Sequence, residues 1–450
     1  MSEDRDKNKA LDWKSKAIVR GKDCRGLKKR VKELSASRDM WQNKYKELKR
    51  GGDNQASIGG IESKPGGHQY PLWLLTLVLD LSRYGGMSLR SCKHCVQCLS
   101  DQMGLCVRAP SHVSIRNWLL KQGYYMYKQR KAIEELPGKW AVIVDESIMV
   151  GTQRLLVVLG LNLSTWKFDR PISLEDVSVL HIEVRSEWKG KEVKRALELA
   201  TAGLEVVQGV SDSGRNLLNS FDLWEVDHFP DCSHKIANIL KKHLKKNRLF
   251  VLMCTESSIL RQCWNIGKYA EWIPPKPRGK SRFMNVFPLV DWTTKIIKEE
   301  IKLPGEVRQK TEWLFDNRSF YQTLQTLHHT ISQVLLILKS QGVQTTSIKE
   351  AKNLLSKSDD PLIQLIYMDL QVYLEELLKK IKQNDEPRIC CSDIIETLFG
   401  KFKYRLKNVN TFTDFALVIP FFCGKITQQM VKMAFSFATL EQVKNWNKAA

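Results

Sequence analysis

The pattern of apolar and polar residues changes along the chain, and its middle part is typical of β-strands. Short apolar runs bounded by turn residues occur between residues 136 and 245, with amphipathic helical segments among them. The elements predicted are strands at 139–150, 154–163 and 177–186, a helix at 190–203, a strand at 204–214, a helix at 215–221, a strand at 223–231 and a helix from 232. The first three strands predict an antiparallel meander, and the later ones are expected to add in parallel through helical crossovers.

The C-terminal half has the periodicity of helices. Leu- and Ile-rich segments with helical spacing fill most of residues 246–387. A further amphipathic helix is predicted over 388–407, with Ser392 as its N-cap and with Asp393 and Glu396 in its first turns. The rest of the chain is also predicted to be helical.

The N-terminal 50 residues are polar and basic, with 17 Lys or Arg against 8 acidic residues. Apolar residues recur there with alternating spacings of four and three, and Arg38 interrupts the series. This heptad pattern predicts a short coiled coil that pairs two subunits, or a single basic helix that lies on DNA or in solvent. Residues 51–70 are rich in Gly and Ser and are predicted to be a flexible linker. The heptad positions are Leu27, Val31, Leu34, Trp41, Tyr45 and Leu48.

Residues 71–135 have the pattern of a helix-turn-helix. Helices are predicted at 71–84, at 88–99 with Ser88 as N-cap, and from Ser111 to a stop at Gly123. Any small helical bundle has the same pattern, but the outer face of the last helix is polar and basic. The side chains expected to contact DNA from this helix are Arg116, Asn117 and Lys121.

Charge indicates the class of partner. Lys and Arg number 71 against 49 Asp and Glu, which leaves a net charge of +22, while the hydrophobic content of 43% is ordinary for a globular protein. An excess of this size favours polyanions, because each cation placed on a phosphate releases condensed counterions. Nucleic acid is therefore the expected partner, with acidic membranes or ribosomes as alternatives.

The apolar segments and the cysteines indicate the compartment. The N-terminal 16 residues have no apolar core, and the most apolar stretch, 71–81, is too short to cross a bilayer. A soluble, cytoplasmic protein with reduced thiols is expected, associated with the nucleoid if the host is bacterial. Cys92, Cys95 and Cys98 are spaced either as one face of a packed helix or as metal ligands.

Two carboxylates stand where charge has no packing role. Asp145 stands at the end of an apolar run, and Asp212 ends another strand in a tight SDSG turn. Because these strands are predicted to be neighbours, the two carboxylates should lie side by side and repel each other unless a metal ion is present. Glu146 and Asp227 are rival ligands, although Glu146 should face the other side of its strand.

These residues resemble a known family. The strand order is that of the ribonuclease-H-like fold, and IVDES, VSDSG and the distant SDIIETLFGKFK resemble the DDE transposases of bacterial insertion sequences. The resemblance implies that Glu396 is the third carboxylate and that Lys403, two turns along its helix, contacts DNA. The Arg that related families place four residues before the Glu is absent here, since Ser392 stands there. Lys401 and Arg405 on the same helix are further expected DNA contacts.

A second segment resembles another branch of these enzymes. DCSHKIAN, residues 231–238, is similar to the Cys/His segment that follows the second Asp in hAT-type transposases. The resemblance implies that Cys232 and His234 help to position a flanking base or the scissile phosphate.

The function that this resemblance implies is DNA transposition. Asp145, Asp212 and Glu396 would hold two Mg²⁺ or Mn²⁺ ions, cut the transposon's terminal inverted repeats and join them to target DNA, with the protein acting as a dimer or higher oligomer. The alternatives are a nuclease that cuts without joining and a non-enzymatic DNA-binding regulator derived from a transposase. The expected parts are a basic helical segment at 1–50, a linker at 51–70, a helix-turn-helix-like domain at 71–135, a catalytic core at 136–245 and 388–450, and a helical insertion at 246–387.

Overall fold

The computed structural model describes most of the chain from residue 64 onward. The described residues are 35, 38–39, 64–103, 107–129, 137–150, 152–264, 268–276, 283, 286–355, 358–381, 386–405 and 414–449. The predicted heptad positions and most of the predicted linker lie outside them, as does Cys106.

The described chain forms two compact units. The sheet unit contains residues 59–236, 332–356 and 368–450, and the helical unit contains 237–331 and 357–367. Three long helices, α8, α13 and α15, contribute residues to both units. Part of the segment expected as a helical insertion therefore groups with the sheet.

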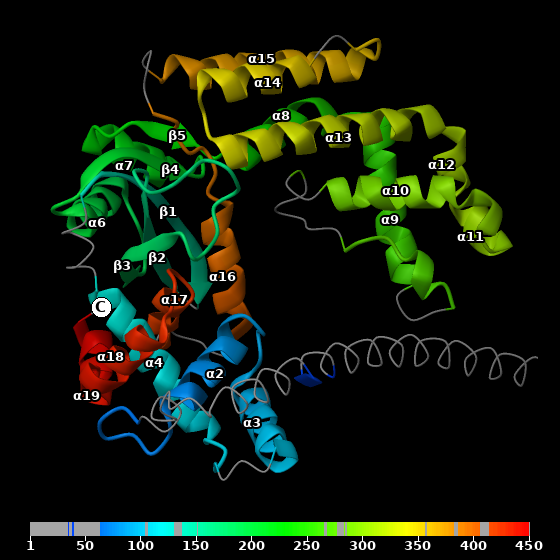
Figure 1. Ribbon diagram of the computed structural model, residues 1–450. Helices are drawn as coiled ribbons and strands as arrows, with labels where there is room; N and C mark the ends of the chain where they lie inside the picture. The colour runs from blue at the N-terminus through cyan, green and yellow to red at the C-terminus, as the bar shows by residue number, and fades with distance from the viewer. Residues whose placement is uncertain are drawn as a thin grey trace, which may run out of the picture. The chain divides into compact units, whose positions relative to one another are not determined.

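The sheet unit is built on a five-stranded mixed sheet in the order β3-β2-β1-β4-β5 (Figure 1). β1 pairs with β2, and β2 with β3, in antiparallel fashion, whereas β4 pairs in parallel with β1 and with β5. The predicted meander and the parallel crossovers are confirmed, and the fold is of the mixed α/β class. The strands are β1 Lys139–Val150, β2 Gln153–Asn162, β3 Val177–Arg185, β4 Glu205–Ser211 and β5 His228–Pro230.

Alternation along β1 sends its side chains to two different layers. Val142 and Val144 point into an apolar cluster with α6 (Gly190–Thr201) and α7 (Arg215–Trp224). Because neighbouring side chains on a strand point to opposite faces, Asp145 faces away from these two helices. Helix α16 (Asp393–Arg405) also packs against β1.

A bundle of helices completes the sheet unit. The predicted Ser88 cap is present, since Ser88 Oγ accepts from Ser91 N at 3.1 Å, and Ser111 caps α4 in the same way by accepting from Ser114 N at 3.0 Å. The bundle consists of α2 Leu72–Arg83, α3 Leu89–Met103, α4 His112–Lys128, η5 Asp414–Leu417, α17 Val418–Phe421, α18 Gln428–Phe437 and α19 Leu440–Ala449.

The predicted end of α4 at Gly123 is wrong, because the helix continues to Lys128. A Cβ added at Gly123 would lie 1.8 Å from the carbonyl oxygen of Leu417. Glycine is required at this position by a close backbone contact in mid-helix, and not by a helix stop.

The segment after β4 also differs from the sequence prediction. Helix α7 runs on to Trp224, and Glu225 then adopts a left-handed φ of 58°. The strand predicted at 223–231 is consequently shortened to the three residues of β5. The remaining elements are α8 Cys232–Leu244, α9 Arg248–Trp264, η3 Ala270–Trp272, α10 Phe287–Lys298, η4 Glu300–Lys302, α11 Gly305–Lys310, α12 Glu312–Asp316, α13 Arg318–Gln341, α14 Thr345–Leu354 and α15 Pro361–Lys379.

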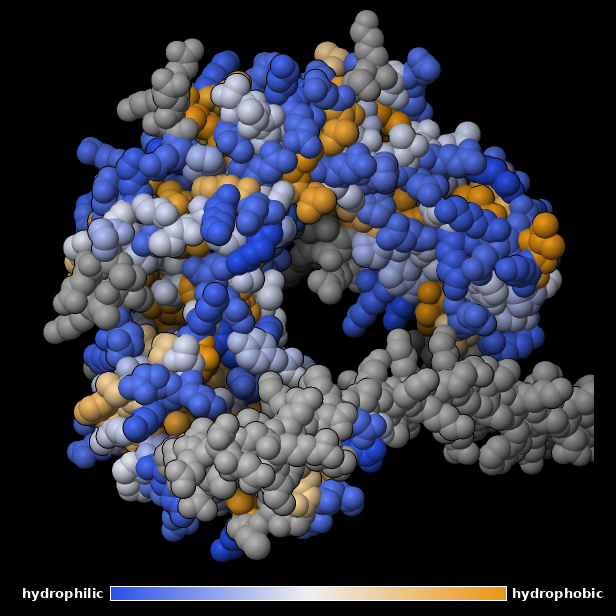
Figure 2. Space-filling model, in the orientation of Figure 1, coloured by the Kyte–Doolittle hydropathy of each residue, from blue (hydrophilic) through white to orange (hydrophobic). Residues whose placement is uncertain are grey.

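Hydrophilic residues cover most of the face of the molecule shown in Figure 2. None of the described helices combines the length and the apolar character needed to span a bilayer.

The three cysteines of α3 differ in their exposure. Cys92 is fully buried, Cys95 is half-buried and Cys98 is exposed. Within the described ranges these three thiols do not converge on a metal-binding group, which favours the packed-helix interpretation.

Candidate functional site

Asp145 and Asp212 lie at the same edge of the sheet. Ile143 on β1 pairs in parallel with Val210 on β4, and each aspartate stands two residues further along its own strand. Both side chains are half-buried. The Asp212 carboxylate also accepts a hydrogen bond from Gly214 N at 2.8 Å. The register therefore sets the two aspartates at the same level of neighbouring strands, where β4 ends and where β1 continues to Val150 in antiparallel pairing with β2.

Glu396 approaches this edge from the first turn of α16. Burial raises the pKa of Glu396, the negative charges of Asp393, Asp231 and Asp212 raise it further, and His234 opposes the rise. Since charges interact in this way only at short range, Glu396 and Asp212 share one electrostatic environment. Asp145, Asp212 and Glu396 are called the carboxylate group below.

His234 is the cation beside these acids. Its Nε2 atom lies 3.7 Å from Glu396 Oε1, and its Nδ1 atom lies 3.1 Å from Asp231 Oδ1. The hydrogen bond to Asp231 raises the pKa of His234 to about 9, with smaller contributions from Glu396 and Asp212 and with burial opposing. The imidazole is therefore positively charged at neutral pH.

Asp231 connects two elements of the site and was not among the predicted site residues. Its carboxylate is fully buried. Oδ1 accepts from His234 N at 2.7 Å, while Oδ2 accepts from Ser392 N at 2.6 Å and from Ser392 Oγ at 2.8 Å. Burial raises the pKa of Asp231, but the hydrogen bonds from His234 and Ser392 outweigh it, and the net shift is downward.

Through these bonds Asp231 joins the start of α8 to the start of α16. The local signal in the sequence is an Asp directly after a strand, followed by a His three residues later at the start of a helix. That pattern identifies Asp231 as a helix N-cap. It does not identify Ser392, the other partner, which is 161 residues away along the chain.

The start of α16 differs in part from the prediction. The helix begins at Asp393, directly after Ser392 as expected, and both predicted acids lie in its first turn. The Ser392 hydroxyl, however, donates to Asp231. Residues 388–392 are not helical, and Ile389 exchanges hydrogen bonds with the buried side chain of Gln208 at 2.9 and 3.1 Å. The predicted helix from 388 is therefore wrong in its first five residues.

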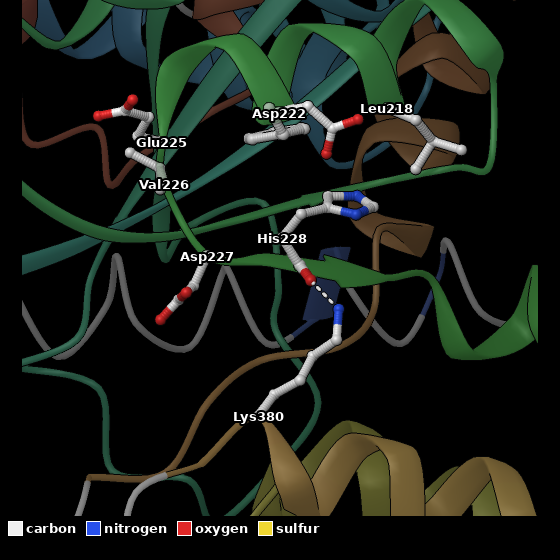
Figure 3. A pocket seen from close by; sticks show the side chains of 8 residues that line it. Leu218, Asp222, Glu225, Val226, Asp227, His228 and Lys380 are labelled. Carbon is white, nitrogen blue, oxygen red and sulfur yellow. Dashed lines mark hydrogen bonds between the residues drawn. The ribbon is translucent and has the colours of Figure 1, made fainter.

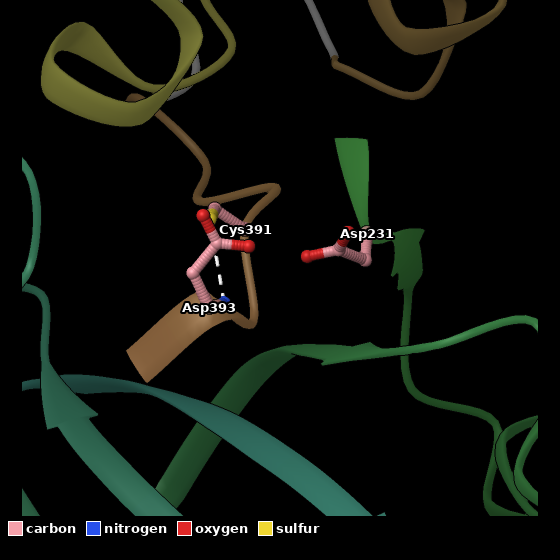
Figure 4. A group of neighbouring side chains, drawn as sticks. All are labelled: Asp231, Cys391 and Asp393. Carbon is pink, nitrogen blue, oxygen red and sulfur yellow. Dashed lines mark hydrogen bonds between the residues drawn. The ribbon is translucent and has the colours of Figure 1, made fainter. Parts of the chain in front are cut away.

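A second group of possible ligands lies next to the carboxylate group. Asp231, Cys391 and Asp393 each offer one ligand atom, and these atoms lie within 4.8 Å of one another (Figure 4). The group can therefore hold a metal ion. In the described structure, the Lys339 ammonium is already ion-paired with Asp393. Burial lowers the pKa of Lys339, but Cys391 and Asp393 outweigh it and raise the pKa overall.

Cys232 and His234, the two predicted supporting residues, face different surroundings. Cys232 is fully buried, and its backbone N donates to Cys390 O at 2.7 Å. Hydrogen bonding to Cys390 also raises the pKa of the Cys232 thiol well above its ordinary value. His234 alone of the two lies against the carboxylate group.

The predicted DNA-contacting side chains are exposed to different degrees. Arg116, Asn117 and Lys121 are half-buried, because α4 packs against α3, α17 and α18. Lys121 Nζ lies 3.4 Å from His68 Nε2, and burial lowers the pKa of this lysine.

On α16, Lys403 is exposed, and Lys401 Nζ donates to the carbonyl oxygen of Arg83 at 3.3 Å. The side chain of Arg405 lies outside what the structure describes.

The two rival acids occupy other positions. Glu146 accepts a hydrogen bond from Asn216 of α7 at 3.3 Å and so lies on the opposite face of β1 from Asp145. Burial raises the pKa of Glu146, and the charge of Asp212 contributes to the rise, so Glu146 is also within electrostatic reach of Asp212. Asp227 precedes β5, at the opposite end of the parallel strands from Asp212.

Asp227 lines a cavity of about 590 Å³ in the sheet unit (Figure 3). There His228 stacks on Phe221 with ring centres 4.7 Å apart, and Lys380 donates to the His228 carbonyl oxygen at 2.6 Å. Burial lowers the pKa of His228 to about 4, and Lys380 contributes to the shift. The other lining residues are Leu218, Asp222, Glu225 and Val226.

Comparison with known proteins identified no relative. No protein-family model matches the chain, and no curated protein matches it. Function is therefore inferred from the carboxylate group and the residues that hold it.

Proposed function

We propose that this protein is a DDE-type transposase that cuts transposon ends and joins them to target DNA. The observation that carries the proposal is the arrangement of three acids on separate elements, although among the described residues only Asp231, Cys391 and Asp393 bring their ligand atoms within 4.8 Å of one another. Asp145 and Asp212 stand at the same level of neighbouring parallel strands, and the charge of Asp212 contributes to the raised pKa of Glu396 on α16. Negative charge that accumulates at one place destabilises the fold by itself, but it is suited to binding a cation.

The chain topology supports the same proposal. A meander of three strands followed by two parallel strands, in the order β3-β2-β1-β4-β5, is the arrangement expected of a ribonuclease-H-like core. The helices between α8 and α16 occupy the place in the chain where DDE transposases carry an insertion.

The donor set suits Mg²⁺ or Mn²⁺. Carboxylate oxygens are the hard ligands that these ions prefer, and burial together with neighbouring acids raises the pKa of Glu396, as expected where negative charge accumulates. Asp145, Asp212 and Glu396 would hold the ions. When bound, such ions neutralise charge on the entering and leaving oxygens of a phosphodiester.

The protein's own residues position the reacting DNA. The carboxylate group lies at the sheet edge where the scissile phosphate would be placed, with the cationic His234 beside it to contact a phosphate oxygen. Water first hydrolyses a phosphodiester at the transposon end and frees a 3′-OH. That hydroxyl then attacks a phosphodiester of target DNA, forms the new bond and releases a target 3′-OH. Exposed Lys403 is suited to the flanking backbone.

The test uses a labelled duplex, taken from the DNA that flanks the gene, together with a supercoiled plasmid and Mg²⁺. The wild-type protein is expected to give both cleaved and joined products. Asp145→Asn should reduce both by on the order of a thousandfold while leaving duplex binding intact. Asp227→Asn is the matched control, because Asp227 is exposed and precedes β5 at the opposite end of the parallel strands, and it should stay within about tenfold of wild type.

Two outcomes would reject the proposal. Cleavage that is unchanged in Asp145→Asn would exclude the carboxylate group as the site. Cleavage without any joined product would favour a nuclease of the same fold.

A further inference from the structure

The corner between α8 and α9 carries a dense cluster of positive charge in the helical unit. We define the basic corner as Lys241, Lys242, Lys245, Lys246 and Arg248, all of which are exposed. No Asp or Glu occurs between Cys232 and Thr255. The spacing of the four lysines, i, i+1, i+4 and i+5, places them along one side of the corner.

The backbone of this corner is held by hydrogen bonds and buried side chains. Asn247 N donates to Leu244 O at 3.0 Å, and Asn247 Oδ1 accepts from Phe250 N at 3.0 Å, which caps α9. Leu244 and Phe250 are each only 1% exposed. The basic side chains therefore project from a defined turn.

Four of the five residues of the basic corner have no acidic partner among the described residues. In the part of the chain that the structure describes, Lys241, Lys245, Lys246 and Arg248 form no ion pair. Other basic residues of the same unit are paired: Lys268 and Lys310 with Glu306, and Arg308 and Arg318 with Glu300.

Helix stability does not account for this arrangement. Cations are favoured in the last turn of α8, which explains Lys241 and Lys242. Arg248, however, begins α9, where the positive end of the helix dipole disfavours a cation. Lys241 and Lys245 also repel each other as like charges four residues apart. A polyanion bound from outside would remove these unfavourable interactions.

We propose that the basic corner binds the phosphate backbone of double-stranded DNA, as a contact separate from the carboxylate group. The proposal rests on the proposed function for the choice of DNA. Between Lys241 and Arg248 the only apolar side chain, Leu244, is buried, so this stretch offers no side chain to insert into a lipid headgroup layer. Contacts to phosphates carry no sequence information, so this binding is expected to be independent of sequence.

The test compares two triple variants of the full chain by fluorescence anisotropy with a duplex of about 30 base pairs and arbitrary sequence, in EDTA and over a range of salt concentrations. Lys245→Gln/Lys246→Gln/Arg248→Gln removes three unpaired charges. It is expected to raise Kd about tenfold or more and to reduce the slope of log K against log salt by about 2 to 3. Lys268→Gln/Arg308→Gln/Lys310→Gln removes three charges that are already paired, and it should change Kd by less than about threefold.

Thermal melting establishes that both variants are folded, and the single substitutions Lys245→Gln and Lys246→Gln replace the triple if it is not. An unchanged Kd and salt slope would overturn the proposal. Weaker binding to phosphatidylserine vesicles with unchanged duplex binding would also overturn it, in favour of a membrane surface. If the wild-type protein binds duplex through this corner but neither cuts nor joins DNA, the transposase assignment fails and the basic corner stands.

Discussion

Asp231 fixes the position of residues that touch the proposed substrate, although it faces none of that substrate itself. One of its oxygens is bonded to His234, and the other is bonded to the backbone and hydroxyl of Ser392. Such supporting carboxylates commonly matter almost as much as the residues they orient. Glu396 lies one turn beyond Ser392, so its placement depends on the same bonds.

Asp231→Asn is therefore expected to reduce strand cleavage by about 10- to 100-fold without unfolding the protein. An amide has one acceptor oxygen where the carboxylate has two, so either His234 or Ser392 loses its partner. Ser392→Ala should have a smaller effect, because the bond from the Ser392 backbone N remains.

The measurement that separates positioning from general destabilisation is the pKa of His234, read by NMR in EDTA. That pKa should fall from about 9 towards its ordinary value in Asp231→Asn. An unchanged pKa in a variant with reduced cleavage would contradict the positioning role.

The same pair makes stability depend on pH. The folded protein raises the pKa of His234 from 6.5 to about 9. The charged form is therefore bound more tightly in the folded state, and this stabilisation is complete below pH 6.5 and disappears as the pH rises towards 9.

In EDTA, we compare the free energy of unfolding of wild type with that of His234→Gln. The difference between the two proteins should be larger at about pH 6 than at about pH 9.5, by roughly 1–2 kcal/mol once the partial exposure of the ring is allowed for. Urea unfolding at several pH values measures this difference. A difference that does not change with pH would show that the pair is not coupled to folding.

At the scale of elements, Gly123 provides the clearest test of packing. In an isolated helix, Gly→Ala is favourable by about 1 kcal/mol. Here the added methyl would collide with the Leu417 carbonyl, so Gly123→Ala is expected to destabilise the protein by about 1–3 kcal/mol.

Gly400→Ala is the matched control for this substitution. Gly400 also lies within a helix, α16, but no atom outside that helix's own backbone lies within 4 Å of the place that an added methyl would occupy. The control should stabilise the protein by up to about 1 kcal/mol. The midpoint of denaturant unfolding is measured for both variants. Equal shifts in Gly123→Ala and Gly400→Ala would contradict the packing explanation.

The elements that the sequence predicts well are those whose signal is local. The first strand is predicted at its observed bounds, since apolar residues precede and follow its polar segment DES. Asp145 and Asp212 could be placed on neighbouring strands because each directly follows a run of mostly apolar residues.

The errors arise where a distant contact decides the structure. Gly123 meets Leu417, and Ile389 meets Gln208, across the fold. Asp231 escaped prediction for the same reason, because its bonds to Ser392 leave no pattern in the local sequence.

At the scale of the whole molecule, two neighbouring groups compete as the place where a metal ion binds. The carboxylate group has oxygen donors from three elements. The other group, Asp231, Cys391 and Asp393, has a thiol, a carboxylate that already accepts hydrogen bonds and one that is paired with Lys339. Mg²⁺ prefers oxygen to sulfur, and an ion in the second group would have to displace the lysine.

The free energy of global unfolding, measured with and without Mg²⁺ in variants of each group, distinguishes the two. An ion that binds only the folded state stabilises the entire protein. At a Mg²⁺ concentration about one hundred times its Kd, the expected gain is about 2.7 kcal/mol. Asp145→Asn should abolish this gain, whereas Cys391→Ser should retain it, as should Asp227→Asn at the opposite end of the parallel strands. The reverse result, with the gain lost in Cys391→Ser and kept in Asp145→Asn, would place the metal ion in the second group and remove the basis for assigning catalysis to the carboxylate group.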